Sequence, residues 1–378
     1  MGMADFPVAE FEHRLERVQF AMHAGNIDAI LFTSEAEIRY FAGFRTLFWQ
    51  SPARPWFLVL PSIGKPIAVI PEIGAALMGT TWIDDIRTWA SPAADDDGIS
   101  LLSSVLGKFV RIGLMMGRES SLRMPLADFN TLQANLRSAS FVDVSPMVSE
   151  LRMLKSSAEI EIISAICTIA SNSFENADTL FYEGQKLNEA FRAFKIELLK
   201  QGAEDVPYLV GGAGESGYED VISPPDDTPL KKGDVLMLDT GATLRGYFCD
   251  FDRNFAIESA NDAAKTAYAT LYTATEAALD IARPGATCAE LFSVMAKVIG
   301  SNSSDVGRYG HGLGLQLTET PSIISFDETV LEAGMVITLE PSMMVGEGKM
   351  MVHEENIVIR DGMPQLLSKR AAPELPII

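Results

Sequence analysis

The sequence VLMLDTGATLRGYFCDFDRNFAI, residues 235–257, decides the fold of this chain. Two apolar runs flank a short turn that contains glycine, which is the pattern of a β-hairpin. The first run leads into Asp239, and the second contains Asp250 and Asp252. Because side chains alternate between the two faces of a strand, Asp250 and Asp252 are expected on the same face. The hairpin is therefore expected to carry acidic side chains into an apolar setting.

These acids need an explanation because a carboxylate inside an apolar strand is costly to bury unless it is paired. Two carboxylates brought together by one hairpin also repel each other. A metal ion between Asp239 and Asp250 would remove both penalties. The alternative is that both acids are solvated residues at the ends of strands, and the sequence further along the chain favours the metal site.

Composition narrows the class of protein. The chain has 378 residues, 47% of them hydrophobic, and a formal net charge of −21. Such a charge argues against binding of nucleic acid and fits a cytoplasmic enzyme with a surface that attracts cations. No apolar run is long enough to span a membrane, and no secretory signal is visible. The odd number of cysteines (Cys167, Cys249 and Cys288) argues against a disulfide framework and a thiolate zinc site.

The pattern of apolar runs indicates two domains. Residues 1–148 alternate helical and strand patterns and are expected to form an α/β domain. Residues 149–378 begin with two long helical patterns and end in a β-rich region, so an α+β domain is expected there. The boundary is placed near residues 144–155.

Three further segments supply residues of the types that bind metal ions. His311 lies in the glycine-rich sequence GHGLG, where the backbone can approach a ligand closely. Glu340 ends the apolar run VITLE. In the expected strand 351–359, His353 and Glu355 share one face, and Glu354 points to the other. Four carboxylates and one imidazole form a hard anionic site suited to Mn²⁺, Co²⁺, Zn²⁺ or Fe²⁺.

The local sequences GDVLMLDTGA, GYFCDFDRNF, GHGLG, TLEP and EENIVI, in this order, resemble the dinuclear site of the pita-bread metallohydrolases. That family includes aminopeptidase P, prolidase, methionine aminopeptidase and creatinase. The sequences RYFAGF at 39–44 and LRMLKSSAE at 151–159 resemble the N-terminal domain and linker of the prolidase and creatinase branch. The resemblance covers nearly the whole chain. It implies a creatinase/prolidase-like N-terminal α/β domain and a pita-bread catalytic domain.

The resemblance also implies roles for five residues. Asp239 would chelate one of two divalent ions, and His311 would bind the other. Asp250 and Glu355 would bridge the pair, and Glu340 would bind the second ion and transfer a proton. Two such ions activate water and polarise the carbonyl of a scissile bond.

The expected substrate contacts depart from the peptidases. Peptidases of this family have two further histidines, and Thr318 and either Ile222 or Ser223 stand in their places. Asp252 replaces a threonine beside Asp250, and His353 lies where prolidases usually have an arginine. Asp252 and His353 are candidates for a second base or a substrate contact. The alternative is that they support the site by hydrogen bonding, or that Asp252 pairs with a nearby cation.

The loop at 48–56 contains Trp49 and Arg54. In creatinase-like relatives the equivalent loop reaches the site of the partner subunit, so these residues are candidates for closing over a small substrate in a homodimer. The alternative is a core tryptophan and a surface arginine.

The first interpretation is a hydrolase of C–N bonds that requires two divalent metal ions and resembles an Xaa-Pro dipeptidase or aminopeptidase P, acting on a dipeptide or another small molecule. Two alternatives keep the fold: a lyase for dimethylsulfoniopropionate, and a creatinase-like or ectoine-hydrolase-like enzyme for a small osmolyte. A third is a binding protein without catalysis, against which the complete set of five ligands argues.

Overall fold

The computed structural model describes residues 6–51, 55–94, 96–300 and 307–378. It divides into two compact units, Met1–Leu151 and Arg152–Ile378. The division falls three residues after the position expected from the sequence. It lies inside helix α6 (Ser145–Met153), so a helix rather than a loop occupies the boundary.

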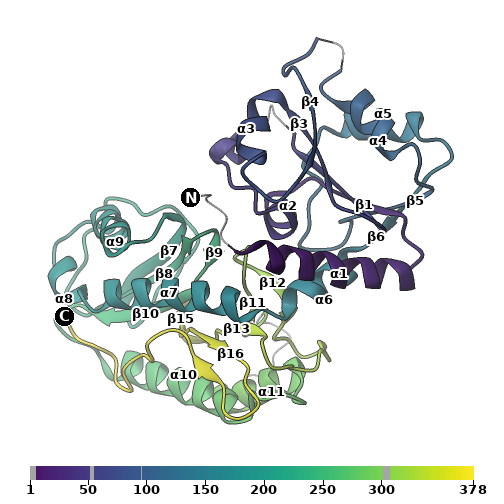
Figure 1. Ribbon diagram of the computed structural model, residues 1–378. Coiled ribbons are helices and arrows are strands. Elements are labelled where there is room, and N and C mark those ends of the chain that lie inside the picture. The colour runs from purple at the N-terminus through teal and green to yellow at the C-terminus, as the bar shows by residue number, and fades with distance from the viewer. Residues whose placement is uncertain (1–5, 52–54, 95, 301–306) are drawn as a thin grey trace. The chain divides into compact units, whose positions relative to one another are not determined.

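The N-terminal unit is built on a six-stranded mixed sheet with the order β4-β3-β2-β1-β5-β6 (Figure 1). Strand β1 pairs antiparallel with β2 and parallel with β5. The elements of this unit are α1 (Val8–Ala24), β1 (Ala29–Phe32), α2 (Glu35–Ala42), η1 (Leu47–Gln50), β2 (Phe57–Pro61), β3 (Ile67–Pro71), η2 (Glu72–Gly74), α3 (Ala75–Met78), β4 (Asp85–Trp89), α4 (Ile99–Leu106), β5 (Arg111–Leu114), α5 (Leu126–Asn135), β6 (Ser140–Asp143) and α6.

Both faces of this sheet are buried, which explains why its central strands are apolar at every position rather than at alternate ones. Helices α4 and α5 pack on the face that carries Leu31 and Val59. On the opposite face, Ile30 and Leu58 are fully buried as well. The expected α/β domain is confirmed.

The C-terminal unit contains two larger sheets and a separate hairpin. The first sheet has the order β10-β8-β7, and the second has the order β12-β11-β13-β16-β17. The elements are α7 (Ser157–Phe174), α8 (Ala177–Leu180), α9 (Leu187–Gln201), β7 (Asp205–Glu215), β8 (Asp234–Leu244), β9 (Tyr247–Phe248), β10 (Phe251–Ala256), α10 (Asp262–Ile281), α11 (Cys288–Ile299), β11 (His311–Gly312), β12 (Glu319–Ser322), β13 (Val336–Leu339), β14 (Ser342–Gly346), β15 (Lys349–Val352), β16 (Glu355–Val358) and β17 (Gln365–Leu366).

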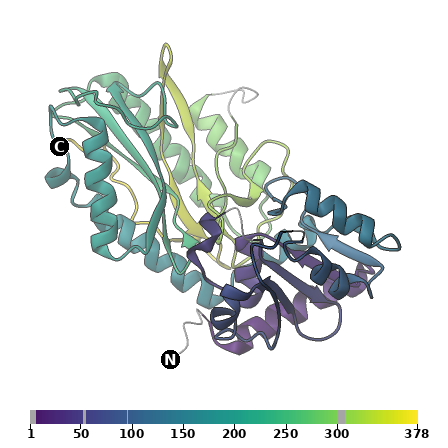
Figure 2. The same cartoon turned by 90° about the horizontal axis from the view of Figure 1, so that it is seen from above.

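Helices cover each of these sheets and bring them together. Helices α7 and α9 pack against β8 and β7, whereas α10 and α11 share a core with β13 and β16. Strands β10 and β16 contact each other, so the two sheets meet (Figure 2). Side chains from both sheets can therefore converge on one place.

The hairpin expected at residues 235–257 is present. Strand β8 does not end at Asp239 but continues to Leu244, and Arg245 and Gly246 form the turn with φ angles of 48° and 74°. Asp239 and Asp252 lie directly opposite each other in the β8–β10 ladder. Directly opposite residues of an antiparallel pair point to the same face, so these two acids share one side of the sheet.

The strand expected at 351–359 is broken. Strand β15 pairs with β14, and β16 pairs with β13, so the chain leaves one sheet and enters another between Val352 and Glu355. His353 and Glu354 belong to neither ladder. This junction determines which glutamate reaches the functional site.

No helix in the described ranges is long and apolar enough to cross a membrane. The three cysteines are buried and free.

Candidate metal centre

Side chains from the two sheets of the C-terminal unit converge where the sheets meet. Asp239 lies on β8, and Asp250 lies between β9 and β10. The second sheet supplies His311 from β11, Glu340 from the residue after β13, and Glu354 from the junction before β16. These five side chains are the candidate metal centre.

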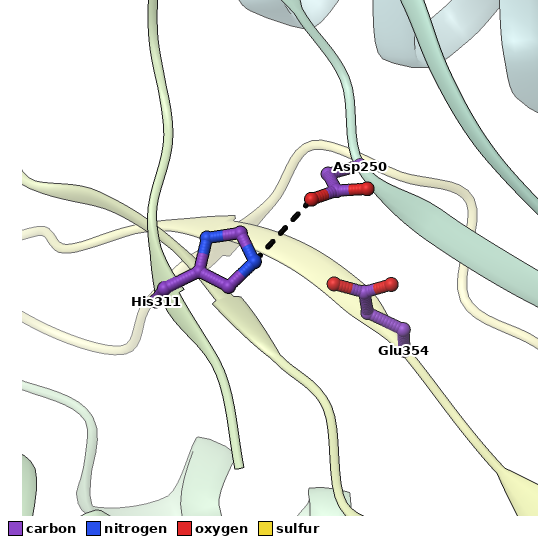
Figure 3. Close-up of side chains that lie close together, drawn as sticks. All are labelled: Asp250, His311 and Glu354. Atoms are coloured by element: carbon purple, nitrogen blue, oxygen red, sulfur yellow. Dashed lines mark ion pairs between the residues drawn. The ribbon is translucent and has the colours of Figure 1, made fainter. Parts of the chain in front are cut away.

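Its tightest group consists of Asp250, His311 and Glu354, all buried (Figure 3). One ligand atom of each residue lies within 4.8 Å of the others. The imidazole Nε2 of His311 is 3.4 Å from Oδ2 of Asp250. The three side chains point toward one another from separate segments of the chain, so a single cation could contact all of them.

The hydrogen bond of His311 determines which ring nitrogen is free. Its Nδ1 lies 2.8 Å from the carbonyl oxygen of Gly312, which can only accept, so Nδ1 carries the proton. Burial lowers the pKa of His311 to about 4, and the charge of Arg308 adds to this effect, so the ring is neutral at neutral pH. Nε2 therefore presents a lone pair to Asp250 and Glu354. This arrangement, with the second ring nitrogen held by a carbonyl, is usual for histidines that bind metal ions.

The glycine-rich surroundings of His311 are required by close backbone packing. Gly310 has a φ of 132°, and a Cβ atom there would lie 2.2 Å from the carbonyl oxygen of Thr338. The hydroxyl of Thr338 in turn accepts a hydrogen bond from the His311 backbone at 3.2 Å. A side chain at position 310 would displace the histidine from the centre.

Asp239 and Glu340 lie close enough to Asp250 to affect its ionisation. Burial raises the pKa of Asp250 well above its ordinary value, and the charges of Asp239 and Glu340 raise it further. Burial also raises the pKa of Asp239 to about 7, although a hydrogen bond from Tyr208 opposes this effect. The pKa of Glu340 is raised to about 8, by burial and then by Asp239.

The pKa of Glu354 is shifted in the same direction. Burial raises it well above the ordinary value, and the charges of Asp250, Glu340 and Asp239 raise it further. The side-chain atoms Oδ1 of Asp239 and Oε1 of Glu354 are buried and have no hydrogen-bond partner. Buried carboxylate oxygens are rarely left unpaired. Unpaired oxygens, clustered acids and a free imidazole lone pair together fit the binding of divalent cations.

The assignment of Glu355 to this centre is wrong. Its carboxylate accepts hydrogen bonds from Arg253 at 3.0 Å and from Arg370 at 3.1 Å, and also from the Ser368 hydroxyl and the backbone of Ala371. Despite burial, the charge of Arg253 lowers the pKa of Glu355. The alternation of faces was predicted correctly, but Glu354 is on the face of the candidate centre and Glu355 is on the other.

The side chain of His353, like that of Glu355, points away from the centre. Its Nε2 lies 3.1 Å from a guanidinium nitrogen of Arg370, which can only donate, so Nδ1 carries the proton and bonds to Thr275 at 3.1 Å. The ring also packs edge-on against Tyr268 and Tyr272. Both nitrogens are therefore engaged, and the candidacy of His353 as a base or substrate contact is not supported.

Asp252 lies on the same face as Asp239 but makes supporting contacts. Its Oδ2 accepts a hydrogen bond from Asn254 at 2.8 Å, and the same nitrogen of Asn254 donates to the carbonyl oxygen of Val352 at 2.8 Å. Burial raises the pKa of Asp252 well above its ordinary value, against the opposing charge of Arg253. Asp252 thus holds the segment that carries Glu354.

Thr318, which stands where peptidases have a histidine, contacts a residue that sequence reasoning missed. The guanidinium of Arg308 donates to the Thr318 hydroxyl at 3.3 Å. The positive charge of Arg308 also opposes the rise in the pKa values of Asp250 and Glu340, so it acts on the centre. Tyr208, the partner of Asp239, was missed as well. Neither residue lies in a motif, although Arg308 is only three positions before His311.

Two residues of the loop at 48–56, Trp49 and Arg54, were candidates for contacting the substrate. Trp49 is 9% exposed, and it packs against Trp56 and under the guanidinium of Arg123. Within its own unit it is a core aromatic residue, which is the alternative considered above. Arg54 lies outside the described residues.

The fold and the centre define a metal-dependent hydrolase with the two-domain pita-bread architecture. Residues 161–361 match the model of metallopeptidase family M24, and residues 14–154 match the creatinase/prolidase N-terminal domain. The chain belongs to metallopeptidase family M24.

Curated relatives agree with this assignment. The chain is 31% identical to an Xaa-Pro dipeptidase of Pyrococcus horikoshii over 66% of this chain and 72% of the relative. It is 29% identical to an Xaa-Pro dipeptidase of Pyrococcus furiosus over 94% of this chain and 97% of the relative. Because the second match is nearly complete in both chains, the similarity includes both domains.

Solved structures share the fold. The dipeptidase PepE from Mycobacterium ulcerans superposes with a TM-score of 0.85 and 24% identity, over 98% of this chain and 99% of that chain. A prolidase from Thermococcus sibiricus gives a TM-score of 0.87 at 22% identity, over 97% and 99%. The expected fold class is therefore confirmed.

Proposed function

We propose that this protein is an Xaa-Pro dipeptidase-like hydrolase that uses two divalent metal ions. The observation that carries the proposal is the lone pair of His311 Nε2, which faces the carboxyl groups of Asp250 and Glu354. The names of the relatives support a dipeptide as substrate. They do not favour the lyase or the osmolyte hydrolase.

The residues that would hold the ions are Asp239, Asp250, His311, Glu340 and Glu354. Mn²⁺, Co²⁺, Zn²⁺ and Fe²⁺ all suit such a set of oxygen and imidazole ligands. When bound, a pair of such ions polarises the carbonyl of the substrate and makes a water molecule more acidic.

The chain's own residues would complete the reaction. Glu340 would take the proton from the attacking water and pass it to the leaving nitrogen, as a positioned carboxylate does in general acid–base catalysis. Tyr208 would hold Asp239 in place through its hydrogen bond. Asp252 would hold the Glu354 segment and take no part in proton transfer.

Substrate contacts would come from the side of the centre that faces Arg308 and Thr318. A guanidinium next to a hydroxyl is suited to a carboxylate, because both groups donate hydrogen bonds. The terminal carboxylate of a dipeptide is therefore the group that we expect there. Thr318 would then replace the histidine of other peptidases as a substrate contact.

We further propose a homodimer in the cytoplasm. The resemblance of the loop at 48–56 to creatinase-like relatives supports the dimer, although the buried Trp49 leaves only Arg54 as a candidate for reaching a partner. The free buried cysteines and the high negative charge fit a reducing, cytoplasmic environment. A solution mass equal to one chain would contradict the dimer.

The deciding experiment is a substrate panel. The purified protein, supplied in turn with Mn²⁺, Co²⁺, Zn²⁺ and Fe²⁺, is assayed on Xaa-Pro dipeptides, dimethylsulfoniopropionate, ectoine and creatine. We expect cleavage of Xaa-Pro dipeptides and its loss in His311→Ala. Turnover of an osmolyte without turnover of any dipeptide would overturn the proposal.

A further inference from the structure

The backbone of Asp250 lies at the edge of its sheet, where no further strand pairs with it, although the residue is buried. Strand β10 is the outermost strand of the order β10-β8-β7. The preceding residue, Cys249, directs its N–H toward β8, where it bonds to the carbonyl of Ala242 at 3.0 Å. Since consecutive residues of a strand direct their backbone groups to opposite sides, those of Asp250 point away from β8. They need a partner from outside the sheet.

Asn356 supplies that partner with its side chain. Its Oδ1 accepts a hydrogen bond from the Asp250 N–H at 2.9 Å, and its Nδ2 donates to the Asp250 carbonyl oxygen. The carboxamide thus makes the two bonds that a neighbouring strand would make. Asn356 is fully buried on β16, two residues after Glu354.

The carboxamide is itself held in one orientation. The thiol of Cys167 lies 3.3 Å from the same Oδ1, and the backbone of Asn356 bonds to the Ser368 hydroxyl at 3.0 Å and to the N–H of Leu367 at 2.8 Å. Asn356 is therefore fixed both at its backbone and at its side chain.

Thr338, the residue opposite Asn356 in the β13–β16 ladder, holds the backbone of His311 by one hydrogen bond. Its hydroxyl accepts the hydrogen bond from the His311 backbone N–H, and it is fully buried. Two facing residues on adjacent strands thus each hold the backbone of one member of the tightest group. Neither side chain is itself part of that group.

We infer that Asn356 and Thr338 are positioning residues that set the spacing of Asp250, His311 and Glu354 for a metal ion. The inference rests on the proposed metal centre and goes beyond it. The first sheet supplies Asp250, and the second supplies the other two residues. The Asn356 side chain links the backbone of Asp250 to the second sheet by hydrogen bonds, and Thr338 fixes the backbone of His311 to the same pair of strands.

The test compares isosteric variants. Thr338→Val removes the acceptor for His311, and Thr338→Ser keeps it. Asn356→Asp keeps the acceptor for the Asp250 N–H but loses the donor to its carbonyl oxygen. The matched control is Thr275→Val, because Thr275 is also fully buried and its hydroxyl bonds to His353, on the side away from the centre.

The metal-free proteins are titrated with Mn²⁺ by calorimetry, and the visible absorption of Co²⁺ bound to them is recorded. We expect Thr338→Val and Asn356→Asp to weaken Mn²⁺ binding by about 10- to 100-fold and to alter the Co²⁺ spectrum. Thr338→Ser should retain the wild-type affinity and spectrum. Thr275→Val should retain both even if it unfolds at a lower temperature.

Each outcome decides the inference. Affinity and spectra in Thr338→Val and Asn356→Asp equal to those of Thr275→Val would overturn it. If one variant does not fold, the other decides. A wild-type protein that binds no divalent ion would overturn both the inference and the proposed function. A wild-type protein that binds ions but cleaves no Xaa-Pro dipeptide overturns only the proposed function, since the affinities still decide the inference.

Discussion

Nε2 of His311 faces Oδ2 of Asp250 at 3.4 Å, and both atoms present lone pairs to the space between them. The imidazole proton is on Nδ1, where the Gly312 carbonyl accepts it. Two acceptors at this separation repel unless a proton or a cation lies between them. Burial and the mutual repulsion of the neighbouring acids raise the pKa values in the centre, so protons and metal ions compete for the same oxygens.

The first prediction concerns removal of metal. Treatment with a chelator should abolish activity, and Mn²⁺ should restore it. The bound ions should also stabilise the fold, by about 2.7 kcal/mol when the free ion is at 100 times its Kd. Calorimetric unfolding with and without Mn²⁺ measures this shift. The shift should be smaller in His311→Ala, and an unfolding temperature independent of Mn²⁺ would count against the centre.

The second prediction separates two adjacent glutamates. Glu354→Gln should abolish metal-dependent activity with little loss of stability, because it replaces a buried carboxyl group that has no cationic partner and whose ionisation burial opposes. Glu355→Gln should destabilise the fold by up to about 3 kcal/mol, because it leaves two partly buried guanidinium groups without their carboxylate. Denaturant unfolding and metal titration of both variants give the comparison. If Glu355→Gln abolished metal binding and Glu354→Gln destabilised the fold, Glu355 and not Glu354 would be the metal ligand.

The third prediction is a pH dependence of the metal-free protein. The pKa of Asp239 is about 7 and that of Glu340 about 8, both above the values in an unfolded chain, so the folded state binds more protons. Stability should therefore fall as pH rises from about 4.5, near the pKa of these acids in an unfolded chain, to about 8, by about 1.4 kcal/mol per pH unit for each proton difference.

In the lower part of that range the histidines act in the opposite direction. The pKa values of His311 and His353 are about 4 and 3, so the unfolded chain binds more protons on these two groups up to about pH 6.5, which offsets the effect of the two acids. Unfolding measured at several pH values should therefore show a decline that is steeper above about pH 6.5 than below it. With Mn²⁺ bound the decline above pH 6.5 should disappear, and its persistence would contradict the assignment of these acids as ligands.

The fourth prediction tests the role of His353. His353→Gln should leave kcat and KM within a few-fold of wild type, because the ring points away from the centre. It should lower the free energy of unfolding by about 1–3 kcal/mol, because the hydrogen bonds to Thr275 and Arg370 become poorly oriented. A fall in kcat of more than tenfold at unchanged stability would show that His353 takes part in the reaction.

Much of the fold could be predicted because the local patterns agree with the tertiary structure. The hairpin at 235–257 was evident from apolar runs around a turn, and the glycine-rich setting of His311 indicated close backbone packing. The order of acidic residues along the chain gave the family resemblance. These are properties of short segments, which a sequence displays directly.

The errors and omissions arise from contacts between distant segments. The alternation of side chains along a strand predicted that Glu354 and Glu355 face opposite sides. Which of the two binds guanidinium groups depends on the positions of Arg253 and Arg370. Tyr208 reaches Asp239 because β7 pairs with β8, and that register is not visible in the local sequence. Asn356 likewise depends on the meeting of two sheets.

The change of sheet between Val352 and Glu355 also affects how this segment tolerates insertions and deletions. Loss of one of the two glutamates would preserve an acid at the junction, yet a single carboxylate cannot serve the arginines and the metal ions at once. A one-residue indel here should therefore eliminate either folding or catalysis, even though composition barely changes. Homologous chains that both fold and catalyse the reaction are expected to have a constant length across this junction.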